Sequence, residues 1–366
     1  MLPRVKPFSC LVVLFVVVVS GAAWAQAAPI AACTDHSKCP ATSFAPKGLA
    51  VTLPVFRSYS PEVAKQQVTR VIVVIHGDSR TAAASFDNVA TLVAAAKDTT
   101  TMVLAPHFLA LSLNCKPCTG DDDRPDLVTK DDVHLVWTCD SWKAGEAALN
   151  AMTTTSFAVI DELIEEQLAS LPKLTDVVIA GHSAGGQFVN RYAAATRLKH
   201  AEVKLRFVIA NPSSYLYFDD RRPTAACGAG TGVCATVADF PFDETARFGS
   251  CPAFNHWKYG VENRVGAAAA LSGDDLRKAY LSRDIVYLLG LKDNITDKDP
   301  RAKGNDLDTS CAAHAQGTSR LLRGRAYAAY LKTVHGAKPV VHEVPGCKHD
   351  SKCMFTSADG QAALLH

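Results

Sequence analysis

One stretch decides the fold: Val177-Val178-Ile179-Ala180-Gly181-His182-Ser183-Ala184-Gly185-Gly186. Its first four residues are apolar and three of them are β-branched, which is typical of a short buried strand. The next segment, residues 187–195, has the composition of a helix. The Gly-x-Ser-x-Gly pattern between strand and helix predicts a turn too tight for side chains at its two glycines. We therefore expect a strained backbone at Ser183 and a hydroxyl presented above the sheet edge, beside the amides that begin the helix.

Strands and helices alternate on both sides of this stretch. Apolar runs predict strands at residues 48–56, 70–75, 101–106, 204–210, 284–289 and 338–344. Helical spacing predicts helices at residues 86–97, 156–168 and 320–334, the first with Ser85 as its N-cap. Residues 28–48 are expected to be irregular. This alternation predicts an α/β fold with a mostly parallel sheet.

The serine motif and a second motif resemble those of the α/β-hydrolase family. The strand at 70–75 ends in His76-Gly77, and in that family the loop after such a strand supplies a backbone N–H to an oxyanion hole. The resemblance covers nearly the whole chain and implies the α/β-hydrolase fold, with helices on both faces of the central sheet. It places oxyanion donors at the amides of Ala184 and of Gly77 or Asp78, whereas His76 itself is expected to support the loop. Exported serine esterases and polyhydroxyalkanoate depolymerases are the members that the chain most resembles.

The resemblance also implies a catalytic triad in the chain order serine, acid, histidine. Asp293 directly follows the strand at 284–289 and is the expected acid, while His349 lies in the loop after the last strand and is the expected base. Asn294 begins the sequon Asn-Ile-Thr, and a glycan there would crowd the site. The competing acids are Asp297, Asp299, Asp308 and Asp350, and the competing histidines are His314, His335, His342 and His366.

The first residues predict export. Arg4 and Lys6 precede an apolar run at 11–19 that is too short to span a membrane, and Ala-Trp-Ala follows at 23–25. Residues 1–27 are therefore interpreted as a secretory signal peptide, and the mature protein as secreted or periplasmic. Eleven of the 12 cysteines then remain, which in an exported protein indicates disulfides. The predicted pairs are Cys33–Cys39, Cys227–Cys234, Cys347–Cys353 and, on weaker grounds, Cys251–Cys311, and Cys115, Cys118 and Cys139 are left over.

Two segments depart from the alternating pattern. An excursion at 107–150 carries Trp137 and Trp142, which are expected either to line a substrate cleft or to pack against the core. Residues 212–283, rich in cysteine and proline, are interpreted as a cap or lid inserted into a single catalytic domain at 28–366. The acidic loop around Asp297 lacks the spacing of a calcium-binding loop, so no metal site is expected.

Charge excludes some partners. The chain has 38 Lys and Arg against 36 Asp and Glu, and loss of Arg4 and Lys6 with the signal peptide would equalise the two. A net charge near zero gives no reason to expect nucleic acid as a partner. The sequence thus predicts a serine hydrolase for small or polymeric carboxylic esters that needs no cofactor. A peptidase or amidase with the same triad and a non-catalytic binding module are the alternatives, and the oligomeric state is left open.

Overall fold

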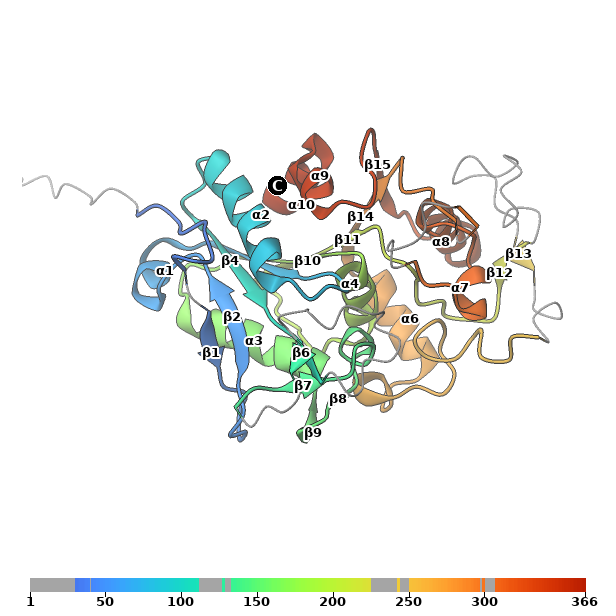
Figure 1. Ribbon diagram of the computed structural model, residues 1–366, viewed down its shortest axis with the longest axis horizontal. Coiled ribbons are helices and arrows are strands. Elements are labelled where there is room, and N and C mark those ends of the chain that lie inside the picture. The colour runs from blue at the N-terminus through green and yellow to red at the C-terminus, as the bar shows by residue number, and fades with distance from the viewer. Residues whose placement is uncertain are drawn as a thin grey trace, which may run out of the picture.

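The computed structural model describes residues 30–39, 41–111, 127–128, 133–224, 242–243, 250–296, 298–299 and 307–366. The strands of its central sheet are β1 (Thr42–Phe44), β2 (Leu53–Arg57), β3 (Arg70–Ile75), β4 (Thr101–Pro106), β10 (Asp176–His182), β11 (Lys204–Ala210), β14 (Asp284–Gly290) and β15 (Val340–Val344). Their order across the sheet is β1-β2-β4-β3-β10-β11-β14-β15 (Figure 1). Neighbours from β4 to β15 pair in parallel, and only β2 pairs antiparallel, with β1 and β4. The predicted α/β class with a mostly parallel sheet is confirmed.

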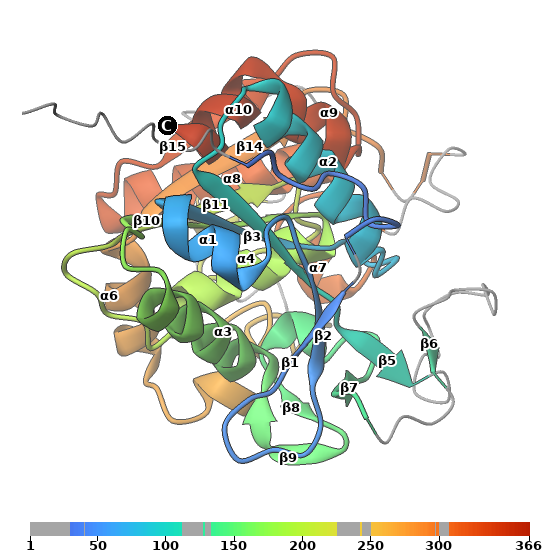
Figure 2. The ribbon, with the colours of Figure 1, turned by 90° about the vertical axis from the view of Figure 1, so that its left-hand side faces the viewer.

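Helices cover both faces of this sheet. They are α1 (Pro61–Gln67), α2 (Ala82–Ala95), α3 (Ser156–Ser170), α4 (Ala184–Ala195), α6 (Gly273–Leu281), α7 (Cys311–His314), α8 (Arg320–His335), α9 (Ser351–Thr356) and α10 (Ala358–Leu365). In both ribbon views α2, α9 and α10 lie on one side of the sheet and α3 and α6 on the other (Figures 1 and 2).

The alternation of side chains along the strands explains why a hydrophobic core lies on each face of the sheet. In β3, Val71, Val73 and Ile75 belong to the hydrophobic core on the side of α3 and α4. Ile72 and Val74 belong to the core on the side of α2, α9 and α10. Since successive side chains of a strand point to opposite faces, a continuous apolar run can be buried on both. The central strands therefore fix the carboxyl edge of the sheet, where the Ser183 turn lies.

Short strands and helices lie in the excursion at 107–150 and in the insertion at 212–283. The excursion after β4 holds β5 (Leu109–Leu111), β6 (Leu127–Val128), β7 (Val136–Trp137), the 3-10 helix η2 (Trp142–Ala144), β8 (Ala147–Ala148) and β9 (Ala151–Thr155). The insertion holds β12 (Arg222–Pro223), β13 (Phe242–Asp243), the 3-10 helix η5 (Gly266–Ala268) and α6. Its interpretation as a cap stays a prediction.

Several predicted boundaries were wrong. The first predicted strand forms only from Leu53, and the segment expected to be irregular contributes β1. Helix α2 begins at Ala82, so Ser85 lies inside it and its hydroxyl donates to the carbonyl of Thr81, the residue at the N-cap position. Five short helices of the described residues, α1, α6, α7, α9 and α10, were not predicted. Alanine-rich and short helical segments carry little hydrophobic periodicity, which is why the pattern did not reveal them.

Three predicted disulfides are present. They join Cys33 to Cys39, Cys251 to Cys311, and Cys347 to Cys353. Cys139, which was left over, is disulfide-bonded as well. The predicted signal peptide, the predicted pair Cys227–Cys234, and Cys115 and Cys118 lie outside the described residues. Within the described ranges, no helix combines the length and the apolar character needed to cross a membrane.

Candidate active site

The serine turn has the expected geometry. Strand β10 ends at His182, α4 begins at Ala184, and Ser183 between them has φ 59° and ψ −121°, a conformation that costs energy in a non-glycine residue. A Cβ at Gly181 would collide with the backbone of Gly185, and a Cβ at Gly185 would collide with the carbonyls of Ile75 and His76. The turn therefore requires glycine at both motif positions.

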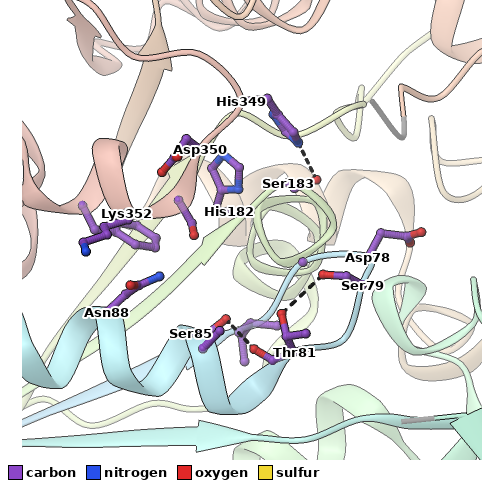
Figure 3. Close-up of a pocket in the computed structure, with 15 residues that line it drawn as sticks. Asp78, Ser79, Thr81, Ser85, Asn88, His182, Ser183, His349, Asp350 and Lys352 are labelled. Atoms are coloured by element: carbon purple, nitrogen blue, oxygen red, sulfur yellow. Dashed lines mark hydrogen bonds between the residues drawn. The ribbon is translucent and has the colours of Figure 1, made fainter. Parts of the chain in front are cut away.

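The structure brings His349 and Asp293 to this serine. His349 Nε2 lies 2.9 Å from Ser183 Oγ, and His349 Nδ1 lies 2.7 Å from Asp293 Oδ2 (Figure 3 draws the Ser183–His349 bond). Because a carboxylate only accepts, Nδ1–H donates to Asp293, which leaves Nε2 to accept from the serine hydroxyl. Asp293 is 1% exposed and Ser183 7%, so water competes little for these bonds.

Local structure holds the two partners in place. Asp293 sits in a turn directly after β14, where its amide donates to the carbonyl of Gly290 at 2.9 Å. His349 lies between β15 and α9 in a loop that the Cys347–Cys353 disulfide brackets. Asn294 is exposed, so a glycan at its side chain would extend into solvent.

The competing residues have other surroundings. Asp308 accepts from the hydroxyl of Tyr259, and Asp350 caps α9 by accepting from the Cys353 amide. His342, in the last strand β15, pairs with Asp359 of α10. His314 ends α7, His335 ends α8, and His366 is the last residue of the chain. Asp299 lies in a turn in which its amide donates to Thr296, and Asp297 lies outside the described residues.

Two polar residues beside the site were not foreseen. Arg320, the first residue of α8, is 1% exposed; its Nη1 lies 3.6 Å from Asp293 Oδ1 and its Nε donates to Ser213. Asn211, at the end of β11, accepts from the Gly290 amide and donates to the carbonyl of Lys348. Asn211 thus joins the two loops that carry the acid and the base. Neither residue belongs to a motif, so no local sequence pattern predicts that it lies at the site.

The loop after β3 is held by His76, as the sequence suggested. The buried ring donates from Nδ1 to the Gly77 carbonyl at 2.9 Å and accepts at Nε2 from the Phe108 amide at 3.1 Å. The Arg80 amide also donates to the Gly77 carbonyl, at 3.0 Å. In a trans peptide the C=O and the following N–H point in opposite directions, so these bonds direct the Asp78 N–H away from His76.

The loop after β3 and the start of α4 both lie beside Ser183. A Cβ added to Gly77 would lie 3.7 Å from Ser183 Cβ, and Gly77 and Asp78 both line the same cavity as the serine. Ala184 is the first residue of α4, so its amide has no acceptor within the helix. This is the arrangement in which two N–H groups can stabilise an oxyanion.

Burial keeps two histidines of the site neutral. It lowers the pKa of His76 to about 3, and it lowers the pKa of His182 well below its usual value, aided by the charges of His349 and Arg320. An unfolded histidine takes up a proton near pH 6.5. Protons therefore bind the unfolded chain preferentially between pH 6.5 and about 3, and the free energy of unfolding falls as the pH drops through this range.

We expect the His76→Gln variant to have a weaker acid sensitivity than the wild type. Each neutral buried histidine contributes a slope of up to about 1.4 kcal/mol per pH unit, which the substitution removes. The measurement is urea unfolding at pH 7 and pH 5 for both proteins. Equal losses of stability in the two proteins would mean that His76 is protonated in the folded state.

Trp137 and Trp142 do not line the cavity at Ser183. Both are 0% exposed and belong to the hydrophobic core. The Trp142 ring lies 4.7 Å from that of His76 and stacks on Phe108, and Trp137 Nε1 donates to the Glu146 carbonyl. Of the two interpretations left open, the structure favours packing, because large aromatic surfaces gain most from full burial. Trp142 thereby supports the ring of His76.

The cavity at Ser183 has a volume of about 370 Å³ and is mostly polar. Figure 3 shows Ser85 and Asn88 from α2 and Lys352 from α9 around it. Among the described residues, those that line it come from 75–88, 182–183 and 349–355, and none from 212–283. Within the same described residues, no group of three or more His, Cys, Asp or Glu is arranged to hold a metal ion.

Comparisons with known proteins agree with this architecture. The structure of poly(aspartic acid) hydrolase-1 from Sphingomonas sp. KT-1 has a TM-score of 0.54 at 23% sequence identity, covering 89% of this chain and 97% of that one. LpqC, a poly(3-hydroxybutyrate) depolymerase from Bordetella parapertussis, has a TM-score of 0.52 at 20% identity, covering 87% of this chain and 85% of that one. Comparison with curated protein sequences gave no match. The model of the alpha/beta hydrolase family matches residues 72–364, and the chain therefore belongs to that family.

Proposed function

We propose that this alpha/beta hydrolase is an exported serine esterase that cleaves carboxylic esters through Ser183, His349 and Asp293. The observation that carries the proposal is the continuous pair of hydrogen bonds from Asp293 through His349 to Ser183, 2.7 and 2.9 Å long, at a strained strand-to-helix turn. Serine becomes a nucleophile only when a base takes its proton and a third group orients that base.

In the proposed first half-reaction, Ser183 Oγ attacks the ester carbonyl carbon while its proton passes to His349 Nε2. The carbonyl oxygen becomes an oxyanion that accepts hydrogen bonds from the amides of Ala184 and Asp78. Collapse of this intermediate breaks the bond to the alcohol oxygen, which takes the proton from His349. Water then repeats the sequence on the acyl-enzyme and releases the acid and the free serine.

Export and substrate size rest on separate arguments. Disulfides persist in oxidising compartments, and three are present among the described residues. The cavity is lined largely by hydroxyl, amide and charged groups, with Ile75, Ala84 and Phe355 as its apolar members. We therefore favour short or hydrophilic acyl groups over long fatty acids. The two solved structures described above are named for polymers. One of these, poly(3-hydroxybutyrate), is a polyester, so a polymeric ester is part of the proposal, whereas poly(aspartic acid) is joined by amide bonds and bears on the amidase alternative.

The test combines turnover with covalent labelling. We expect the purified mature protein to hydrolyse p-nitrophenyl acetate and butyrate, and diethyl p-nitrophenyl phosphate to stop the reaction by phosphorylating Ser183 in a one-to-one ratio. Peptide mass spectrometry locates the label. Hydrolysis that continues after full labelling, or a label on another residue, would overturn the mechanism. Faster cleavage of the matching p-nitroanilides would favour an amidase with the same triad.

A further inference from the structure

A partly buried cluster of ion pairs adjoins the oxyanion side of the site, with Asp140 as its exposed member. Lys143, in η2, places its Nζ 2.8 Å from Asp78 Oδ1 and 2.7 Å from Asp140 Oδ1. The Lys143 side chain is 10% exposed and that of Asp78 21%. Because η2 lies in the excursion after β4, this contact joins two loops that are 65 residues apart in the sequence.

The charges of this cluster depend on one another. Burial alone would lower the pKa of Lys143, but the two carboxylates offset burial and raise it. Burial would likewise raise the pKa of Asp78, and the ammonium of Lys143 offsets this and lowers it. Lysine and aspartate are therefore both ionised near neutral pH. A partly buried carboxylate that loses such a partner is destabilised and moves toward water.

The Lys143 contact completes the fixation of one peptide group. The Gly77 carbonyl accepts from His76 and Arg80, and the Asp78 carbonyl accepts from Arg80 Nη1 at 3.0 Å. Lys143 holds the side chain of the same aspartate. Turning the peptide between Gly77 and Asp78 would break the two bonds at the Gly77 carbonyl, and the contacts of the Asp78 carbonyl and carboxylate hold the Cα from which this peptide extends. The direction of the Asp78 N–H is thus tied to an ion pair formed outside the cavity.

We propose that Lys143 is a positioning residue for catalysis: by holding the Asp78 carboxylate, it keeps the Asp78 amide aimed at the oxyanion. This inference rests on the esterase function proposed above. An oxyanion donor acts only on charge that develops in the transition state, so its displacement slows turnover without weakening ground-state binding. The role of Lys143 is accordingly expected in kcat and not in KM.

The cluster supplies a matched control. Lys258, from the insertion, also pairs with Asp140, at 3.3 Å, and its side chain is 16% exposed. Arg191 of α4 donates to the backbone carbonyls of both Lys143 and Lys258, so the two lysines share one supporting side chain. No contact between Lys258 and Asp78 is present in the described structure. Removing either lysine disturbs the same cluster, but of the two lysines it is Lys143 that contacts Asp78 in the oxyanion loop.

The experiment compares Lys143→Met, Lys143→Arg and Lys258→Met with the wild type, using p-nitrophenyl butyrate. We expect Lys143→Met to lower kcat by about 10- to 100-fold and to change KM by less than about threefold. This loss of kcat is smaller than the loss of about 10²- to 10³-fold that follows removal of a whole oxyanion donor. Inhibition by butaneboronic acid, which forms a tetrahedral serine adduct, should weaken in parallel with kcat. Lys143→Arg keeps the charge and should recover part of the loss, and Lys258→Met should retain kcat within about threefold.

Three outcomes would overturn the proposal: an unchanged kcat in Lys143→Met, a rise in KM alone, or an equal loss of kcat in Lys258→Met. If Lys143→Met does not fold, Asp78→Asn serves as the test variant. It keeps the backbone N–H of residue 78 and leaves Lys143 paired with Asp140. It should show the same loss confined to kcat, and full activity would count against the role. Wild-type protein that is not labelled at Ser183 would instead refute the esterase function itself.

Discussion

Replacing Ser183 by alanine is expected to lower kcat/KM for p-nitrophenyl butyrate by about 10⁵- to 10⁶-fold, as in serine hydrolases whose nucleophile has been removed. His349 and Asp293 have no function in acyl transfer once the hydroxyl that they activate is gone, so the whole triad fails together. The residual rate comes from substrate binding and the backbone amides alone. Steady-state kinetics at high enzyme concentration would measure it.

A second serine provides the control for this prediction. Ser85 lines the same cavity from within α2, where alanine is a favourable replacement, and Ser85→Ala should keep kcat/KM within about threefold. Alanine at position 183 keeps the Cβ and thus the strained turn, so thermal unfolding should change little. A Ser183→Ala protein that is folded and retains more than about one hundredth of the activity would show that another group attacks the ester.

The parts of the fold that the sequence predicted are those in which local pattern and burial agree. The strands at 70–75, 101–106 and 204–210 were predicted with their observed bounds, since short apolar runs of this length are typical of buried strands in a parallel sheet. Helices α9 and α10 were missed because they are short and because their burial depends on α2 packing beside them. That contact is a property of the tertiary structure and leaves no periodic signature.

The same distinction separates the foreseen from the unforeseen residues of the site. Ser183 and His76 belong to short motifs, and the chain order of such sites pointed to Asp293 and His349. Arg320, Asn211 and Lys143 reach the site from elements remote in sequence, and a single arginine or lysine in a helical or loop segment is most simply a solvated charge. For Trp137 and Trp142 the sequence left packing and substrate contact equally open, and only their full burial separates the two.

Replacing Asp293 by asparagine is expected to lower kcat by about 10⁴-fold at neutral pH. The carboxylate accepts from His349 Nδ1–H and so keeps Nε2 free to take the serine proton. An amide group can donate to Nδ1 instead, which would leave the proton on Nε2 and make the ring unable to act as a base. Asp299→Asn, in the same loop, should retain kcat within about twofold. Comparable losses in the two variants would mean that the loop, and not the Asp293 carboxylate, is what the base requires.

Arg320 separates this catalytic effect from stability. The Arg320 side chain is buried, and its Nη1 lies 3.6 Å from Asp293 Oδ1. Asp293→Asn removes the negative charge beside this buried cation and should therefore lower the free energy of unfolding, whereas Ser183→Ala should not. Adding Arg320→Gln to Asp293→Asn removes the buried cation as well. The double variant should regain part of the lost stability and none of the lost kcat, because no carboxylate returns to orient His349. Recovery of kcat in the double variant would contradict the proposed role of Asp293, since the activity loss would then come from the unpaired arginine.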